Sequence, residues 1–266
     1  MQYIFYVLIF IVGAIFGSFL CCQARRLHER ELKGKKLPPR SICMSCKYQL
    51  KWYDNIPILS WLLLKGRCRK CKKKIGAAEI IAEGSCALAA LLVSINFNPE
   101  AMDITSWLVY GTTLMLTLSL CFLGIYDGLY GELPTFALIL SAVIAVASFA
   151  IIIVSFIVSN TFTWPTVYNP LISAIFFGGI YLALYLVSKG KWVGDGDWIL
   201  AGIIGLALGD IWLSAIALFV ANLSASLIML PSVAKKKSSK IYFGPFLVLS
   251  YVLVLCFEPF LSSIVL

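Results

Sequence analysis

Two sets of residues in this sequence could carry chemistry: a pair of aspartates and two pairs of cysteines. Asp127 closes an apolar segment in LCFLGIYDGLYGELPT, and Asp197 opens another in WVGDGDWIL. Two carboxylates that meet at one depth can share a proton, so that the ionised one activates water while the protonated one polarises a carbonyl group. This is the chemistry of an aspartic protease. Either aspartate alone could also be a helix cap or a solvated loop residue.

Small or rigid residues accompany both aspartates. Gly194 and Gly196 remove side chains around Asp197, so the backbone can turn tightly there and a peptide substrate can approach closely. Pro134 follows Asp127 and suits the first turn of the next helix. These residues support a site in which two helix ends meet.

The four cysteines form two C-x-x-C pairs, Cys43 with Cys46 and Cys68 with Cys71. Two such pairs fit one tetrahedral zinc ion held by four thiolates. Four thiolates leave no open coordination position, so the zinc would be structural. Two disulfides are the alternative, which a reducing cytoplasm disfavours.

The elements that must position these residues are membrane helices. The chain is 61% hydrophobic and 13% charged, whereas soluble domains are about a quarter charged. We therefore predict an all-α polytopic membrane protein with about eight transmembrane helices. The predicted spans are residues 3–22, 79–97, 105–126, 134–158, 170–188, 197–209, 211–231 and 243–265. Only Gly209 and Asp210 separate the sixth span from the seventh, so seven spans is the alternative.

The basic residues predict the orientation. All 22 Lys and Arg residues lie within residues 25–76, 189–191 and 235–240. With eight spans and an outside N-terminus, these stretches all fall on the cytoplasmic side, as Lys and Arg should. Both aspartates then lie at the cytoplasmic membrane edge. The net charge of +9 therefore reflects orientation and contact with anionic membrane lipid, and we expect no nucleic-acid partner.

The sequence divides into three parts. Residues 1–22 are the first transmembrane helix, residues 23–78 a cytoplasmic zinc-binding domain, and residues 79–266 a multi-helix membrane domain that holds the aspartic peptidase. A domain of roughly fifty residues has little hydrophobic core, so stabilisation by a bound metal ion is reasonable. Its central segment, KWYDNIPILSWLLLKG, is apolar but too short to span a membrane. This segment either packs on the zinc site or lies at the membrane surface.

Taken in order, the motifs resemble those of the type IV prepilin peptidase family, which are membrane aspartic proteases of the GxGD type. The similar segments are GSFL at 17–20, RSICMSCKYQLKWYDNIPILSWLLLKGRCRKC at 40–71, Glu83, Asp127 with Leu133 and Pro134, GDGD at 194–197 and KIYFGPFLVLS at 240–250. The resemblance implies an endopeptidase that cuts the basic leader from prepilins and pilin-like proteins at the cytoplasmic face of the bacterial inner membrane. It implies Asp127 and Asp197 as the catalytic pair, and leaves Asp195 outside it.

Many members of this family also N-methylate the new terminus with S-adenosylmethionine, so the resemblance implies a second activity in the cytoplasmic domain. No G-x-G-x-x-G fingerprint follows a strand here. Three positions depart from the family pattern: Ile199 replaces the usual Lys, Cys21 the usual Asn, and Thr135 the usual Asp or Asn. These departures concern efficiency and methylation more than the class of enzyme.

Two other classes of protein remain open. One is an ion- or proton-coupled transporter that uses the acidic pair, although such sites lie near the bilayer midplane between repeated halves. The other is a catalytically inactive membrane scaffold. For the peptidase, a basic leader should be met by acidic side chains, and the candidates are Glu29, Glu31, Asp54, Glu79, Glu83, Glu132 and Asp195.

Overall fold

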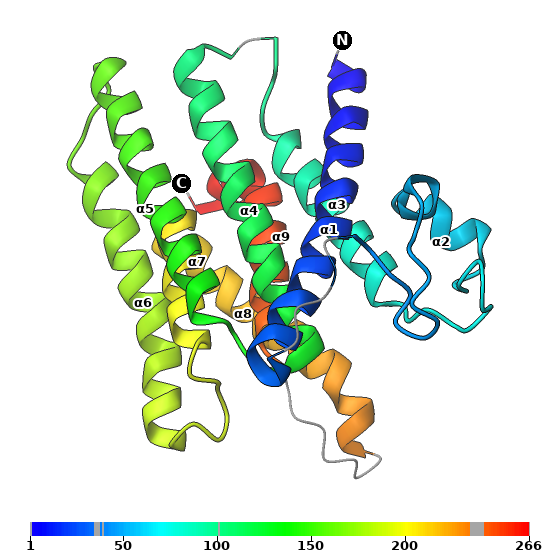
Figure 1. Cartoon of the computed structure of the whole chain (residues 1–266). Helices are drawn as coiled ribbons and strands as arrows, with labels where there is room; N and C mark the ends of the chain where they lie inside the picture. The colour runs from blue at the N-terminus through cyan, green and yellow to red at the C-terminus, as the bar shows by residue number, and fades with distance from the viewer. Residues whose placement is uncertain (1, 35–37, 39, 101, 235–241, 266) are drawn as a thin grey trace. The chain divides into compact units, whose positions relative to one another are not determined.

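The computed structural model describes residues 2–34, 38, 40–100, 102–234 and 242–265. The secondary-structure elements named within these residues are all helices (Figure 1). They are α1 (Gln2–Lys33), the 3-10 helix η1 (Trp52–Asn55), α2 (Leu59–Leu63), α3 (Ala78–Ile95), α4 (Ile104–Tyr130), α5 (Thr135–Val158), α6 (Pro165–Ser188), α7 (Asp197–Leu208), α8 (Ile211–Ala234) and α9 (Gly244–Val265). The predicted all-α class is confirmed.

Within the described residues, seven helices are long and apolar enough to cross a membrane. The sixth predicted span, residues 197–209, corresponds to α7, which has 12 residues. At 1.5 Å per residue this helix is about 18 Å long, shorter than a hydrocarbon core of about 30 Å. The expected eight spans are therefore seven full-length helices and one half-length helix.

The first helix is longer than the span predicted at residues 3–22. α1 continues through Arg25 and His28 to Lys33, so the membrane helix runs into the charged segment without a break. No Gly or Pro follows the apolar run to end the helix there. An ion pair of 2.6 Å between the Arg25 Nη1 atom and the Glu79 Oε1 atom joins this extension to α3.

The helix α6 also begins earlier than the span predicted at residues 170–188. Pro165 occupies the first helical position, where its missing N–H costs nothing. Pro170 then lies inside α6 rather than at its beginning. Because it follows the helix start closely, its missing N–H removes a single early hydrogen bond.

The contacts divide the chain into two compact units, residues 3–91 and residues 92–266. In the first unit, α1 packs closely on α3: a Cβ atom added to Gly13 would lie 2.8 Å from the Ala87 Cα atom. Small residues of this kind let membrane helices approach each other and gain van der Waals contact.

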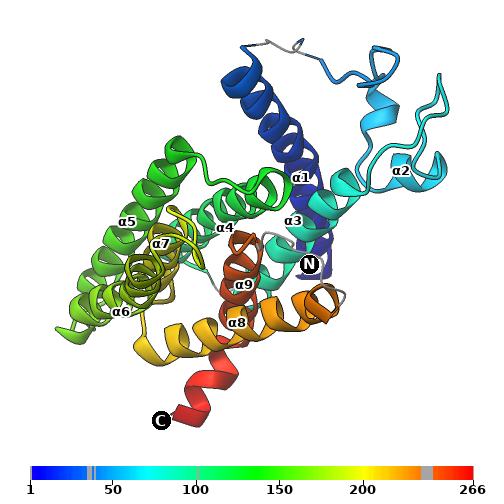
Figure 2. The ribbon, with the colours of Figure 1, turned by 90° about the horizontal axis from the view of Figure 1, so that it is seen from below.

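In the second unit, α7 lies beside α6 in both views (Figures 1 and 2). The two helices approach so closely that a Cβ atom on Gly205 would lie 2.6 Å from the Ser173 carbonyl oxygen. The Ser173 hydroxyl donates to the Gly205 carbonyl oxygen over 2.7 Å and lies 2.6 Å from the Ser214 hydroxyl. This buried serine therefore satisfies polar groups where α7 gives way to α8, as an apolar environment requires.

Candidate active site and metal centre

Asp127 lies in the last turn of α4, and its side chain is buried with 5% of its surface exposed. Gly131, with φ of +73°, ends the helix and donates its N–H to the Asp127 carbonyl oxygen over 2.7 Å. This left-handed conformation suits glycine. The carboxylate Oδ2 atom accepts the backbone N–H of Gly244 over 2.8 Å. Asp127 is thus a helical, buried carboxylate and not a solvated loop residue.

Asp197 is the first residue of α7 and is equally buried, with 5% of its surface exposed. Its Oδ2 atom accepts the N–H of Gly194 over 2.8 Å. The carboxylate therefore binds the loop that precedes α7. In this way both aspartates are held by a backbone N–H of a glycine.

The two aspartates come from opposite helix ends that meet in the second unit. A Cβ atom on Gly196 would lie 2.8 Å from the Leu133 Cβ atom, so the loop before α7 packs directly against the loop after α4. The end of α4 that carries Asp127 and the start of α7 that carries Asp197 therefore lead into loops that contact each other.

Gly244 is a contributor to this site that the sequence analysis did not assign. It lies in the segment KIYFGPFLVLS, whose likeness to a family motif was the available signal. It is the first residue of α9, so its N–H is one of the unpaired donors at a helix start. A Cβ atom here would lie 2.8 Å from the Asp127 Oδ2 atom, which leaves no room for a side chain.

Tyr181 is a second residue that the sequence did not single out. This tyrosine of α6 is almost completely buried, and its hydroxyl oxygen accepts a hydrogen bond from Asn222 of α8 over 3.2 Å. A tyrosine inside an apolar helix carries no sequence signal that separates it from a core residue.

The four cysteines of the C-x-x-C pairs form one cluster in the first unit. The sulfur atoms of Cys43, Cys46, Cys68 and Cys71 all lie within 4.8 Å of one another. The Sγ atoms of Cys43 and Cys71 are 3.9 Å apart, and those of Cys46 and Cys68 are 4.0 Å apart. Tetrahedral zinc with Zn–S bonds of about 2.3 Å would place its sulfurs about 3.8 Å apart. The two printed separations are close to that value, so the cluster can hold a metal ion.

Each cysteine pair lies on a matching tight turn. Cys43 donates its N–H to the Tyr48 carbonyl oxygen over 2.8 Å, and Cys68 donates to the Lys73 carbonyl oxygen over 2.9 Å. The repeated turn aims two thiols at one point from each side. Burial opposes ionisation of Cys43, but hydrogen bonds from the backbone N–H groups of Cys46 and Ser45 lower its pKa to about 6. All four cysteines are free in the structure.

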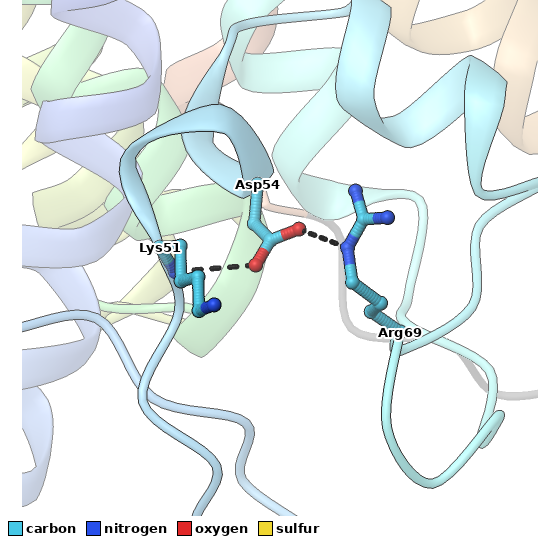
Figure 3. A network of polar contacts seen from close by, with 3 residues as sticks. All are labelled: Lys51, Asp54 and Arg69. Atoms are coloured by element: carbon cyan, nitrogen blue, oxygen red, sulfur yellow. Dashed lines mark hydrogen bonds and ion pairs between the residues drawn. The ribbon is translucent and has the colours of Figure 1, made fainter.

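Three of the acidic residues considered for leader binding are occupied within the first unit. Figure 3 shows Asp54 between the Lys51 backbone N–H and the Arg69 Nε atom, at 3.1 Å and 2.6 Å. Glu79 pairs with Arg25. The Glu83 Oε2 atom accepts the Ile58 N–H over 2.6 Å. These carboxylates serve the internal structure of this unit.

Two other acidic candidates lie beside the aspartate pair. Glu132 and Asp195 are exposed. Glu132 directly precedes Leu133, and Asp195 directly precedes Gly196, the two residues that are in contact. They therefore flank the place where the two loops meet. Glu29 is half-buried and Glu31 exposed on the extension of α1 in the other unit.

Comparison with known proteins agrees with this arrangement. Residues 11–97 match the family defined as the bacterial peptidase A24 N-terminal domain. The prepilin leader peptidase/N-methyltransferase of Stutzerimonas stutzeri is 26% identical over 262 residues, which cover 90% of this chain and 86% of the relative. The enzyme of the same name from Legionella pneumophila is 28% identical over 242 residues, covering 86% and 77%. Over most of its length the chain is therefore similar to prepilin peptidases.

A third prepilin peptidase, the prepilin leader peptidase/N-methyltransferase of Vibrio cholerae, is 38% identical over 95 residues. That alignment covers 34% of this chain and only 38% of the relative's length. No solved structure matched the chain. These similarities agree with a chain that has several membrane-length helices and carries the cysteine cluster in its N-terminal unit.

Proposed function

We propose that this protein is a membrane aspartic endopeptidase that removes the basic leader from type IV prepilins and pilin-like proteins. The observation that carries the proposal is the pair of buried carboxylates, Asp127 and Asp197, each held by a glycine N–H where two helix ends meet. The names of the relatives that align with most of the chain support the same activity.

The glycine contacts suggest how the pair works. Gly244 and Gly194 each donate a backbone N–H to the Oδ2 atom of one aspartate, and these contacts leave the Oδ1 atoms unused. The Oδ1 atoms can therefore face a water molecule and the scissile carbonyl group. The ionised carboxylate takes a proton from water as the water oxygen bonds to the carbonyl carbon. The protonated carboxylate gives its proton to the carbonyl oxygen.

The tetrahedral intermediate that results then breaks its C–N bond. The amide nitrogen leaves as an amine after it receives a proton from the carboxyl group that had taken one from water. The other carboxylate recovers a proton from the diol, so the pair returns to its singly protonated state.

The location of the pair suits the proposed substrate. A prepilin has a basic leader in the cytoplasm and an apolar helix in the bilayer, so its cleavage point lies at the membrane edge. We infer that the chain spans the bacterial cytoplasmic membrane with its N-terminus outside and both aspartates at the cytoplasmic edge. Glu132 and Asp195, exposed beside the pair, are then the best placed acidic groups to meet the leader.

The cysteine cluster would hold one structural zinc ion through Cys43, Cys46, Cys68 and Cys71. The mutual distances of the sulfur atoms support this assignment. Four protein ligands complete the coordination of zinc, so the ion would stabilise the small domain and supply no open site for chemistry.

A second activity is N-methylation of the new pilin terminus with S-adenosylmethionine. Its support is the shared name of the relatives, prepilin leader peptidase/N-methyltransferase. The matched N-terminal segment, residues 11–97, covers the unit in which the family's methylation is expected.

One experiment tests both activities. The protein would be co-expressed with a prepilin, and the new N-terminus of the product sequenced and weighed. The proposal expects a single cut after the leader, and a product 14 Da heavier if the terminus is methylated. An uncut prepilin in the presence of correctly inserted protein would refute the peptidase assignment.

A further inference from the structure

The helix α2 presents an apolar face outward from the first unit. Leu59, Leu62 and Leu63 have the i, i+3, i+4 spacing of one helix face, and 51%, 54% and 73% of their surfaces are exposed. A helix on a water-soluble domain turns its polar face outward. The exposed face of α2 is apolar instead of polar, so an apolar surface outside this unit is expected to cover it.

The direction of this face is fixed from the inner side of α2. Trp61 donates its Nε1–H to the Gly76 carbonyl oxygen over 3.3 Å. Its ring also covers Gly66, where a Cβ atom would lie 2.8 Å from the Trp61 Cζ2 atom. The tryptophan therefore anchors α2 to the segment that leads into α3, and the three leucines stay on the outside.

The depth of α2 relative to the membrane is set by Glu83. This buried residue of α3 accepts the N–H of Ile58, the residue that precedes α2, over 2.6 Å. Ile58 has a φ of +61°, which is costly for a β-branched residue and persists only where the surroundings hold it. Glu83 is the sixth residue of α3, about 7.5 Å along a helix that is apolar enough to span a membrane. The start of α2 is therefore tied to the level of the first turns of that span.

The charges around the face identify its partner. Lys51 and Lys65 flank the η1–α2 segment and are exposed, and Arg67 follows closely. Asp54 is the one acidic residue between residues 41 and 76, and it is buried against Arg69. An exposed apolar face with a basic rim matches an anionic bilayer, in which leucines enter the acyl boundary and cations meet the headgroups. The same rim would repel a peptide with a basic leader.

We propose that the face formed by Leu59, Leu62 and Leu63 inserts into the interfacial region of an anionic phospholipid bilayer. This insertion would hold the cysteine-bearing domain against the membrane leaflet at which α3 begins. The proposal rests on the membrane helices and does not depend on peptidase activity.

The test uses the full chain carrying the Asp127→Asn substitution, reconstituted in nanodiscs, with the photocrosslinker p-benzoylphenylalanine in place of Leu62 or Leu63. Nanodiscs would contain phosphatidylglycerol or phosphatidylcholine, and intact-mass spectrometry would detect phospholipid adducts. The matched control carries the crosslinker at Gln49, an exposed polar position of the first cysteine turn. We expect adducts at Leu62 and Leu63 in phosphatidylglycerol at a yield several-fold above the control.

Two further arms separate the parts of the proposal. The adduct yield should be higher in phosphatidylglycerol than in phosphatidylcholine, and salt or a Lys65→Gln, Arg67→Gln double substitution should reduce that difference. Equal yields in the two lipids would overturn the anionic preference. Yields at Leu62 and Leu63 no higher than at Gln49 would overturn insertion itself. Crosslinking to an added prepilin in place of lipid would assign the face to a protein partner.

Discussion

The backbone N–H of Gly244 lies 2.8 Å from the Oδ2 atom of Asp127, although the two residues are 117 positions apart in the sequence. The start of α9 thus points one of its unpaired N–H groups at a buried carboxylate. The first N–H groups of a helix have no partner within the helix, so α9 supplies a hydrogen-bond donor to one member of the proposed catalytic pair.

Gly244→Ala should therefore impair the proposed peptidase while the protein remains inserted in the membrane. The new Cβ atom would lie 2.8 Å from the Asp127 Oδ2 atom, so the carboxylate or α9 has to move. A displacement of about 1 Å at a catalytic group can cost on the order of 10²-fold in rate. The measurement is single-turnover cleavage of a prepilin. Gly111→Ala, in α4 where a Cβ atom meets open space, is the control and should cleave at the original rate.

Replacing either proposed catalytic carboxylate should abolish cleavage. Asp127→Asn and Asp197→Asn keep the size of the side chain but remove a carboxyl group that shares the proton. General acid catalysis and general base catalysis each contribute about 10²–10⁴-fold to the rate. Asp195→Asn, at the exposed neighbour, should retain substantial activity. Leader removal can be followed by gel shift with N-terminal sequencing. Original activity in either of the first two variants would disprove the assignment.

The acidic residues beside the pair should affect substrate binding more than turnover. Glu132→Gln combined with Asp195→Asn removes two exposed charges next to the contact of the two loops. KM for a prepilin should rise several-fold, with a smaller change in kcat, because the lost attraction to a basic leader acts before the chemical step. A prepilin whose leader lysines are changed to glutamine should show no such rise. An equal rise for both substrates would exclude leader recognition by these residues.

The cysteine cluster should bind one zinc ion per chain. Native mass spectrometry of the detergent-solubilised protein should show the bound ion, and its loss in a Cys43→Ser, Cys46→Ser double variant. Limited proteolysis should then cut the first unit faster, since the metal contributes to its folding. Cys256→Ser, in α9 and outside the cluster, should keep the zinc. Zinc bound equally by the double variant would contradict the four-thiolate site.

The ion pair between Asp54 and Arg69 should stabilise the first unit. The Asp54 side chain is 1% exposed, so Arg69→Ala leaves a buried carboxylate without its cationic partner. The segment between the cysteine pairs should then be digested faster by a protease than in the parent protein. Lys73→Ala, which removes an exposed cation of the same unit, should change little. A matching loss of protease resistance in both variants would show that net charge matters and not this contact.

The sequence predicted most of the helices because long apolar runs and basic loops are local signals. Asp127 and Asp197 could be paired because both stand at the edge of such a run. The contact of Gly244 with Asp127 could not be predicted, since a hydrogen bond between distant residues leaves no local pattern. The extension of α1 was missed for a related reason: the end of an apolar run does not end a helix when the next residues also favour helix.

The half-length helix α7 has a consequence for how Asp197 is aimed. Its far end is clamped by the Ser173 hydroxyl through Gly205, while the carboxylate stands at the other end. Each α-helical residue turns the chain by about 100° and advances it by 1.5 Å. A single residue inserted between the clamp and Asp197 would swing the carboxylate about 100° away from Asp127. The position of Asp197 therefore depends on the number of residues in α7. An insertion in α7 would be far more damaging than most changes of side chain.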